Sequence, residues 1–206
     1  DEADRMFDMG FAPQIEQILR FVPKERQTML FSATMPKEIM TMVNRHMKLP
    51  VSIEIAPSGT TAERVTQELF IVRKEDKVKL LGKLIAQYPG AILLFSRTKH
   101  NAHKLTNCLR EMGYRAAEMH SDRSLAQRRE ALEGFKAGKY KVLVATDIAA
   151  RGIDVTGIEV VINYDLPEDA ENYVHRIGRT ARAGQKGHAI SFAMPDQSKN
   201  VRDIEK

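Results

Sequence analysis

The stretch Lys141–Val155, KVLVATDIAARGIDV, decides the fold. Its first five residues form a short apolar run, which is typical of a strand buried on both faces. Similar runs occur at Ala91–Phe95 (AILLF) and Glu159–Asn163 (EVVIN). Helical patterns of about 12–15 residues lie between the runs, and this alternation predicts βαβ units. The fold class is therefore α/β, with a parallel sheet covered by helices on both faces.

The helical patterns can be located along the chain. Lys74–Tyr88 and Asn101–Met112 each place apolar residues along one face of a helix, and Ser124–Phe135 opens with serine in the N-cap position. Between about Val65 and Met194 we expect roughly six strands and four or five helices, enough for a complete domain.

The first fifty-odd residues show a different pattern. They predict helices at about Pro13–Leu19 and after Pro36, and strands at Thr28–Phe31 and near Val51–Ile55. One or two strands cannot form a covered parallel sheet, and about 55 residues bury too little surface to be secure alone. We therefore interpret residues 1–55 as the C-terminal part of a first domain, the small and turn-forming residues 56–63 as a linker, and residues 64–206 as a second domain.

The composition is that of a globular protein without internal disulfide bonds or membrane-spanning segments. The chain of 206 residues is 43% hydrophobic and 29% charged, which is ordinary for a globular protein. Its single cysteine, Cys108, excludes an internal disulfide. The sequence contains no apolar run of about 20 residues and no signal-peptide pattern, so we expect no membrane partner and a cytoplasmic setting.

The charge balance favours a polyanionic partner without requiring one. Lys and Arg number 32 against 27 Asp and Glu, giving a formal net charge of +5. Aromatic residues make up 6% of the chain and tryptophan is absent, so stacking platforms for bases are scarce. If nucleic acid binds, contacts to phosphate and sugar are the expected mode.

Two short polar segments near the start allow two interpretations each. Asp1-Glu2-Ala3-Asp4 offers carboxylates that suit Mg²⁺ and a glutamate that can take a proton from water, but it also fits the acidic first turn of a helix. Ser32-Ala33-Thr34 follows a predicted strand, where its hydroxyls could relay hydrogen bonds or simply form a turn or an N-cap.

The segment Thr146–Asp154 follows a predicted central strand. Ligands of open parallel sheets gather at the carboxyl ends of the strands. Small residues here permit close approach of a sugar-phosphate backbone, while Thr146, Arg151 and Asp154 offer a hydroxyl, a positive charge and an acceptor for a ribose hydroxyl. The alternative is a tight strand-to-helix turn in which Gly152 breaks the helix.

The segment His175–Gly184 continues a helical pattern that begins near Pro167. If the helix persists, His175, Arg179 and Arg182 lie on one stripe. Cations so close together repel one another unless they share an anion, and guanidinium groups match phosphate oxygens. A polyphosphate is the favoured ligand, and a solvated basic helix face is the alternative. His103 is predicted to be a helix-surface residue.

Taken in order, these four segments resemble the motifs of the DEAD-box RNA helicases, and AILLFSRTK and VLVATDIAARGIDV are most similar to the bacterial RhlE-type group. The resemblance covers essentially the whole chain. It implies two RecA-like domains that bind ATP and Mg²⁺ in the cleft between them and RNA across both. The chain would then hold the complete second domain and the C-terminal remnant of the first.

The resemblance also implies roles for individual residues. Asp1 positions Mg²⁺ through water, Glu2 orients and deprotonates the attacking water, and Arg179 and Arg182 are arginine fingers. Residues that complete the nucleotide site are Gly152 and Asp154, and those that couple nucleotide state to domain closure are Asp4, Ser32, Thr34 and His175. The implied RNA-binding residues, which contact the backbone without reading sequence, are Arg97, Thr98, Asp122, Arg123, Arg128, Thr146, Arg151 and Gly152.

Three positions depart from the family pattern. Ser121 and Ala181 stand where glycine is usual, and Leu125 stands where glutamine is usual. Ser121 puts the close approach of the RNA backbone in doubt at its site, Leu125 stands three residues before Arg128, and the change at Ala181 is the smallest of the three. None of them alters Glu2, Arg179 or Arg182.

The expected function is ATP-dependent RNA helicase activity of the parent protein. The sequence contains no G-x-x-x-x-G-K-[ST] phosphate loop, so the 206 residues alone are expected to be inactive. Two alternatives stay open: a non-catalytic RecA-like module that binds RNA or a partner, and a DNA-directed helicase of the same superfamily. A dinucleotide-binding oxidoreductase is disfavoured because no G-x-G-x-x-G follows a strand.

Overall fold

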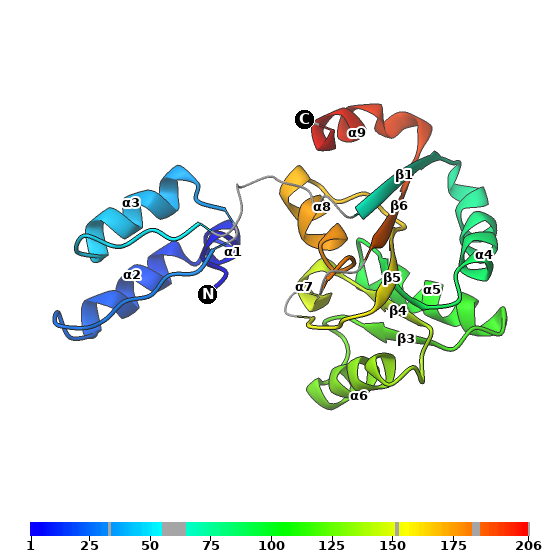
Figure 1. The fold of residues 1–206 in the computed structure, drawn as a ribbon, viewed down its shortest axis with the longest axis horizontal. Coiled ribbons are helices and arrows are strands. Elements are labelled where there is room, and N and C mark those ends of the chain that lie inside the picture. The colour runs from blue at the N-terminus through cyan, green and yellow to red at the C-terminus, as the bar shows by residue number, and fades with distance from the viewer. Residues whose placement is uncertain (33, 55–64, 151–152, 183–185, 206) are drawn as a thin grey trace. The chain divides into compact units, whose positions relative to one another are not determined.

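The computed structural model describes residues 1–32, 34–54, 65–150, 153–182 and 186–205. The chain divides into two compact units, Asp1–Thr60 and Thr61–Lys206, and each is described here by itself. The predicted linker 56–63 lies outside the described residues. Figure 1 shows the helices of the first unit and the sheet of the second.

The first unit consists of three helices and extended segments. The helices are α1 (Ala3–Asp8), α2 (Ala12–Phe21) and α3 (Lys37–His46), so both predicted helices are confirmed. The predicted strand Thr28–Phe31 is wrong, as is the strand at Val51–Ile55 over its described residues 51–54. Both segments carry large apolar side chains, but among the described residues of this unit no neighbouring strand pairs with either, and a strand needs a partner for its backbone groups.

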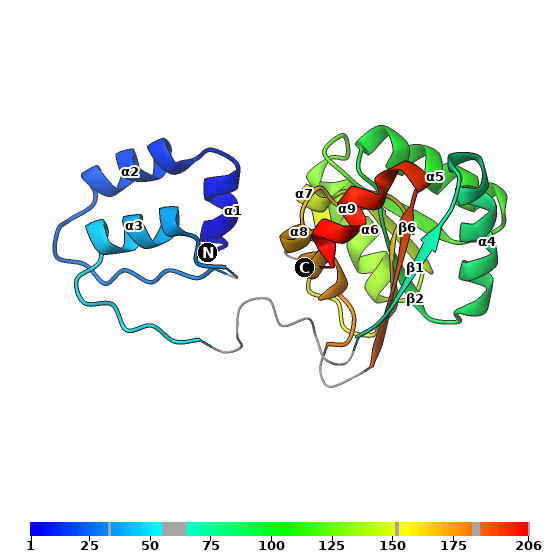
Figure 2. The ribbon, with the colours of Figure 1, turned by 90° about the horizontal axis from the view of Figure 1, so that it is seen from above.

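The second unit contains one parallel sheet of six strands, as predicted. Its strand order is β1-β6-β5-β2-β4-β3, so β5 and β2 lie at the centre and β1 and β3 at the two edges. Figures 1 and 2 show the sheet from two directions. Because all strands run the same way, their carboxyl ends meet at one edge of the sheet. The strands are β1 (Val65–Ile71), β2 (Ala91–Phe95), β3 (Ala116–Met119), β4 (Val142–Ala145), β5 (Ile158–Asn163) and β6 (Gly187–Ala193).

Helices cover both faces of this sheet (Figure 1). Leucines and isoleucines of α4 and α5 pack on one face, and Phe135 of α6 and Ala150 of α7 pack on the other. The described residues of this unit contain six α-helices rather than four or five, since α7 and α9 are short. The helices are α4 (Lys77–Gln87), α5 (Lys99–Glu111), α6 (Leu125–Lys136), α7 (Asp147–Ala150), α8 (Ala170–Ile177) and α9 (Ser198–Ile204), with 3₁₀ turns η1 (Lys74–Asp76) and η2 (Pro195–Gln197).

Local sequence explains where several helices begin and end. The hydroxyl of Thr98 caps α5, and Ser124 and Gln127 form a capping box at the start of α6, which confirms the predicted serine cap. Helix α8 ends at Ile177, and Gly178 occupies its C-cap. The prediction of a helix that continues through Arg182 is therefore wrong. No helix among the described residues is long and apolar enough to cross a membrane.

Candidate nucleotide and nucleic-acid sites

The acidic start of the chain forms a hydrogen-bonded cluster with a distant segment. Asp4 is buried in the first turn of α1, and its Oδ2 accepts hydrogen bonds from the backbone N–H of Thr34 (3.0 Å) and from the Thr34 hydroxyl (3.1 Å). The backbone N–H of Asp4 donates to the Ser32 hydroxyl at 3.0 Å. The structure thus joins Asp4, Ser32 and Thr34, three of the predicted coupling residues.

This cluster sets the protonation of Asp4. Burial alone would raise the pKa of Asp4, but hydrogen bonds from the backbone of Arg5 and Thr34 and from the hydroxyls of Thr34 and Ser32 outweigh burial and hold the pKa below its ordinary value. Asp4 is therefore ionised, and its hydrogen bonds connect α1 to the segment that contains Ser32 and Thr34. The predicted catalytic side chains beside it remain accessible: Asp1 is exposed, and Glu2 is half-buried with its Oε2 3.4 Å from Nη1 of Arg5.

Arg179 and Arg182 converge although no helix carries them. Nη1 of each guanidinium donates to the backbone carbonyl oxygen of Ile153, at 3.0 Å from Arg179 and 3.1 Å from Arg182. Nη1 of Arg182 also lies 3.3 Å from Oδ1 of Asp154, whose side chain is 91% exposed. Three residues predicted for the nucleotide site therefore meet where the chain leaves the turn after β4. His175 lies on α8, one helical turn before Arg179.

Ala181 lies between the two arginines with a left-handed backbone, φ 57°. Glycine adopts this conformation without steric cost, whereas an alanine Cβ crowds the carbonyl oxygen. The departure from the family pattern therefore falls at a position where the backbone itself favours glycine.

Arg176 performs a structural role that the sequence analysis did not identify. Its side chain is buried, and its Nε and Nη2 donate to the two carboxylate oxygens of Asp147 at 2.5 and 2.8 Å. Its Nη1 donates to the side chain of Asn163 and to the carbonyl of Asp165, and its guanidinium lies over the ring of Phe95. This fork fastens α8 to the start of α7 and to the end of β5. The only sequence signal was the pairing of opposite charges 29 residues apart.

A second carboxylate, Asp165, organises the carboxyl end of β2. Its Oδ2 accepts from the hydroxyl of Ser96 (3.3 Å), the backbone N–H of Arg97 (3.1 Å) and the amide of Asn101 (3.1 Å). Its Oδ1 lies 3.4 Å from the buried ammonium of Lys77. The loop that carries Arg97 and Thr98 is thereby held in place by a residue that sequence reasoning overlooked.

Two predicted RNA-binding residues line one hollow at this edge. Arg97 and Thr146 follow the neighbouring strands β2 and β4, and both line a cavity of about 210 Å³ together with residues around Pro167. The exposed guanidinium of Arg97 donates to the carbonyl of Leu166 at 3.1 Å. The side chain of Thr98 is occupied as the cap of α5.

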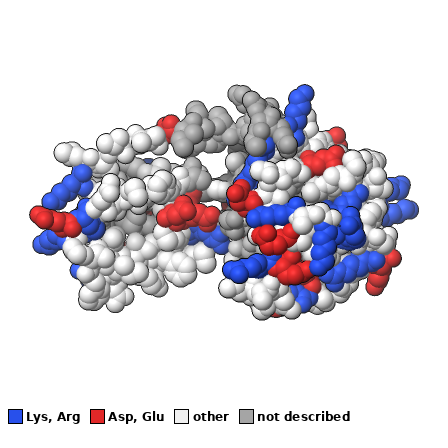
Figure 3. All heavy atoms as spheres, turned by 60° about the horizontal axis from the view of Figure 1, so that its bottom comes forward, with Lys and Arg blue, Asp and Glu red and all other residues white. Residues whose placement is uncertain are grey.

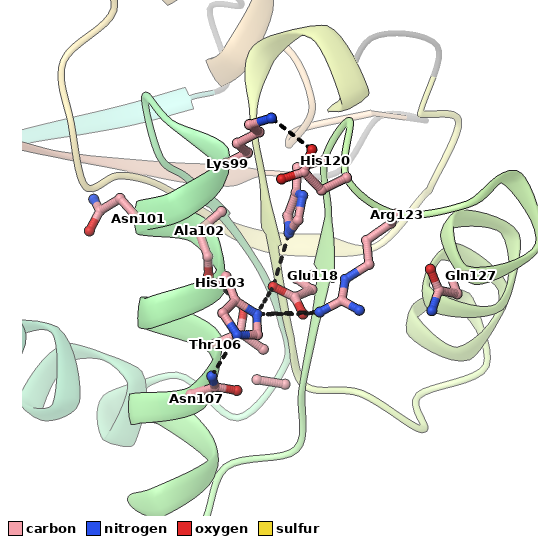
Figure 4. A network of polar contacts seen from close by, with 12 residues as sticks. Lys99, Asn101, Ala102, His103, Thr106, Asn107, Glu118, His120, Arg123 and Gln127 are labelled. Carbon is pink, nitrogen blue, oxygen red and sulfur yellow. Dashed lines mark hydrogen bonds and ion pairs between the residues drawn. The ribbon is translucent and has the colours of Figure 1, made fainter.

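The predicted contacts after β3 have contrasting environments. Asp122 is exposed and pairs with Lys99 at 2.7 Å. Arg123 instead turns inward to Glu118 of β3, as Figure 4 shows. Arg128 lies in the first turns of α6, and its buried Nε has no hydrogen-bond partner within the described part of the chain. Arg151 and Gly152 lie outside the described residues.

Charge is divided unequally between the units. Residues 1–60 contain seven Lys and Arg against eight Asp and Glu, and residues 61–206 contain 25 against 19. The second unit therefore carries the whole positive excess, and Figure 3 shows Lys and Arg side chains spread over its visible face among fewer acidic ones. This distribution favours binding of a polyanion by the second unit.

The residues present are compatible with Mg²⁺ bound together with a nucleotide. Within the ranges that the structure describes, no group of three or more His, Cys, Asp or Glu side chains could hold a metal ion by itself. Mg²⁺ in nucleotide sites is typically held by one or two carboxylates plus phosphate oxygens and water. The exposed carboxylate of Asp1 meets that smaller requirement.

Comparison with known proteins identifies the family. Residues 1–42 match the family described as DEAD/DEAH box helicase, and residues 76–184 match the helicase conserved C-terminal domain. All of the chain aligns with the ATP-dependent RNA helicases DbpA of Bacillus subtilis (44% identity) and RhlB of Shewanella frigidimarina (45%), and it covers 43% and 48% of their lengths.

A solved structure extends the match to three dimensions. S. cerevisiae Dbp5 bound to RNA and ADP BeF3 superposes with a TM-score of 0.87 at 33% identity, covering 98% of this chain and 54% of that one. Membership of the RhlE-type group stays a prediction. The matches at both ends of the chain, together with the RecA-like α/β fold of the second unit, establish that the chain belongs to the DEAD-box RNA helicase family.

Proposed function

We propose that the protein containing this chain is an ATP-dependent RNA helicase that couples ATP hydrolysis to RNA binding and local strand separation. The observation that carries the proposal is the convergence of Arg179, Arg182 and Asp154 around the carbonyl of Ile153. Two guanidinium groups that share one carbonyl oxygen exchange it readily for the more strongly accepting oxygens of a phosphate.

Each residue of the nucleotide site has a chemical task in this proposal. Asp1 holds Mg²⁺ through water, and the ion, when bound, neutralises phosphate charge. Glu2 orients the attacking water and accepts its proton. Arg179 and Arg182 stabilise the charge that develops on the transferred phosphoryl group, while Asp154 and Gly152 contact the nucleotide. Asp4, Ser32, Thr34 and His175 link the nucleotide site to domain closure.

RNA binding is assigned to the carboxyl edge of the sheet in the second unit. Phosphate and 2′-hydroxyl contacts there need no aromatic platform, which agrees with the low aromatic content. The proposed contacts are Arg97, Thr98, Asp122, Arg128, Thr146, Arg151 and Gly152.

The test of the catalytic assignment is RNA-stimulated ATP hydrolysis by the full-length protein. Glu2→Gln is expected to lower the rate about 10²–10⁴-fold, because it removes the base while preserving size. Glu25→Gln, an exposed carboxamide substitution in the same unit, is the matched control and should leave the rate unchanged. Equal rates for wild type and Glu2→Gln would contradict the role of Glu2.

The arginine fingers are tested separately. Arg182→Ala is expected to lower the rate by about 10³–10⁵-fold, as in other enzymes that use such fingers. Arg202→Ala, an exposed arginine of α9, serves as the control. A loss of RNA affinity with no loss of maximal rate would instead assign Arg182 to RNA.

A second candidate applies to the 206 residues alone. The sequence given has no phosphate loop, and residues 61–206 carry the positive excess. We expect this chain to bind RNA weakly and with marked salt dependence, without turning over ATP. ATP turnover by the purified chain would contradict this expectation.

Comparing stimulation of ATP hydrolysis in the full-length protein by RNA duplexes and by DNA duplexes decides between an RNA-directed and a DNA-directed helicase. We place the protein in the cytoplasm.

A further inference from the structure

Glu118 is a nearly buried carboxylate at the edge of the sheet. It lies on β3 and is 6% exposed. Three side chains surround it: His103 from α5, and His120 and Arg123 from the turn that follows β3 (Figure 4). Because the same turn carries Asp122, this buried cluster adjoins the proposed RNA-binding surface.

Both histidines lie within hydrogen-bond distance of the Glu118 carboxylate. Nδ1 of His103 is 3.0 Å from Oε2 of Glu118 and 3.3 Å from Nη2 of Arg123, and Nε2 of His103 is 3.1 Å from the Asn107 amide. Nε2 of His120 donates to Oε2 of Glu118 at 3.0 Å. The buried Nδ1 of His120 has no hydrogen-bond partner within the described part of the chain.

Glu118 is ionised, and Arg123 is its counter-ion. Burial alone would raise the pKa of Glu118, but hydrogen bonds from His103 and His120 and the charge of Arg123 outweigh burial and hold the pKa below its ordinary value. The guanidinium of Arg123 contacts Oε1 of Glu118 directly through Nη2, while Oε2 faces the two histidines. Glu118 and Arg123 therefore form a close ion pair at the end of β3.

This pairing changes what Arg123 offers to RNA. A guanidinium that is neutralised by a buried carboxylate adds little to the attraction of phosphates, and withdrawing it would leave a buried negative charge without its counter-ion. The family resemblance implies that Arg123 binds RNA, but its side chain here points to β3 and not away from the turn (Figure 4).

We propose that Glu118 sets the RNA affinity of this edge by withholding the Arg123 guanidinium from the phosphate backbone. Glu118 is thus an affinity-determining residue that acts through Arg123. The inference rests on the proposed function, because it needs RNA to bind at the turn after β3. It adds a residue that belongs to none of the motifs described above.

The test measures binding of a fluorescein-labelled single-stranded oligouridylate to the 206-residue chain by anisotropy over a series of KCl concentrations. Glu118→Gln keeps an oxygen acceptor for the histidines but removes the charge that holds Arg123. It should tighten binding about three- to tenfold and steepen the slope of log K against log salt by about 0.7, the value for one added phosphate contact on a single strand. Glu133→Gln, an exposed carboxylate on α6, controls for the change in net charge and should alter the slope by much less.

Arg123→Gln separates the proposal from a merely structural role. In the wild-type background it should change affinity less than twofold, whereas in the Glu118→Gln background it should abolish the gain and restore the wild-type slope. Arg128→Gln, which removes an arginine that does not contact Glu118, should weaken binding in both backgrounds. The single variant Arg123→Gln tests the proposal even if Glu118→Gln does not fold.

The outcomes distinguish a failure of the proposed role of Glu118 from a failure of the proposed RNA binding. If the wild-type chain binds RNA and Glu118→Gln leaves the salt slope unchanged, the withholding role is overturned while RNA binding stands. A tenfold loss of affinity in Arg123→Gln alone would likewise overturn it, because Arg123 would then already contact RNA. Absence of salt-dependent RNA binding by the wild-type chain and by every variant would overturn both.

Discussion

The two units bury their apolar residues to very different extents. In the second unit, neighbouring residues of β2 and β4 such as Leu93 and Leu143 are completely buried between layers of helices. In the first unit the buried apolar residues among those described are Ala3, Ile39 and Val43. Large side chains there lie open, with Phe21 and Ile53 each 83% exposed. The second unit therefore carries its own core, whereas the first has little beyond its local helices and the Asp4 cluster.

The difference shows that a sequence can form helices locally without forming a hydrophobic core. Helices α2 and α3 form in both the sequence prediction and the structure because each satisfies its backbone within itself. The apolar segment Thr28–Phe31 cannot do so, since a strand is complete only beside another strand. Both units contain apolar runs and amphipathic helices typical of an α/β domain. Among the described residues, only the second unit also contains neighbouring strands with which such runs can pair.

The largest effect is expected at the buried fork of the second unit. Arg176→Ala removes a buried guanidinium, leaves the buried side chain of Asn163 and the carbonyl of Asp165 without their donor, and leaves the one-third-exposed Asp147 carboxylate without its counter-ion. The loss should lower the free energy of unfolding by about 3–5 kcal/mol. Urea unfolding followed by circular dichroism measures the change. Arg202→Ala on α9 is the exposed control. A loss below about 1 kcal/mol would mean that the core of this unit does not depend on the fork.

A slightly smaller effect tests the contrast between the cores directly. Leu143→Ala removes a fully buried side chain from β4 and should lower the free energy of unfolding by about 2–5 kcal/mol. Phe21→Ala deletes a larger side chain but at an exposed position, and should stay within about 0.5 kcal/mol. Comparable losses for the two variants would show that Phe21 is covered in solution, and the contrast between the units would fail.

The Asp4 cluster should make the first unit sensitive to acid. Because the pKa of Asp4 is lowered in the folded state, its stabilising contribution is present above the unfolded value of 3.8 and is lost as the pH falls through the folded pKa. Asp4→Asn should cost about 1.5–3 kcal/mol at neutral pH. Hydrogen exchange at the Thr34 amide, measured against pH, reports the loss. Unchanged exchange of the Thr34 amide in Asp4→Asn would show that the Asp4 hydrogen bonds do not stabilise the first unit.

The smallest effect concerns the turn between Arg179 and Arg182, the proposed arginine fingers. Ala181→Gly relieves a left-handed backbone that costs about 1–2 kcal/mol for a residue with a Cβ. The greater freedom of glycine in the unfolded chain offsets about 0.4–1 kcal/mol of that gain, so the second unit should become more stable by about 0.5–1 kcal/mol. Thermal unfolding of the two proteins measures the change, and a loss of stability would show that Ala181 makes compensating contacts.

The sequence predicted the second unit well because its signals are local. Uninterrupted apolar runs located β2 to the residue and β4 and β5 to within one residue, and Ser124 marked the start of α6. The end of α8 was missed because Gly178 outweighs the basic residues that follow it. Arg179 and Arg182 nevertheless converge, because both donate to the carbonyl oxygen of Ile153 from a turn rather than from one face of a helix.

The polar ties between distant segments were beyond the reach of the sequence. Arg176 and Asp147 lie 29 residues apart, and Asp165 and Lys77 lie 88 apart. No periodicity links such pairs, because their contact depends on how the strands are ordered in the sheet. His103 does lie on the helix surface as predicted, and half of its side chain is exposed, but nothing in the sequence pointed to Glu118 as its partner.

The carboxylate of Asp165 has a consequence for how a force on the proposed RNA-binding loop at Arg97 is transmitted. One oxygen gathers donors from the end of β2, from the loop at Arg97 and from α5, and the other faces Lys77 at the start of α4. A pull on the backbone at Arg97 should therefore pass through one carboxylate to the end of β2 and to α4 and α5, and both helices pack on the same face of the sheet. Asp165 should therefore distribute a force applied at Arg97 over several segments before the force reaches the hydrophobic core.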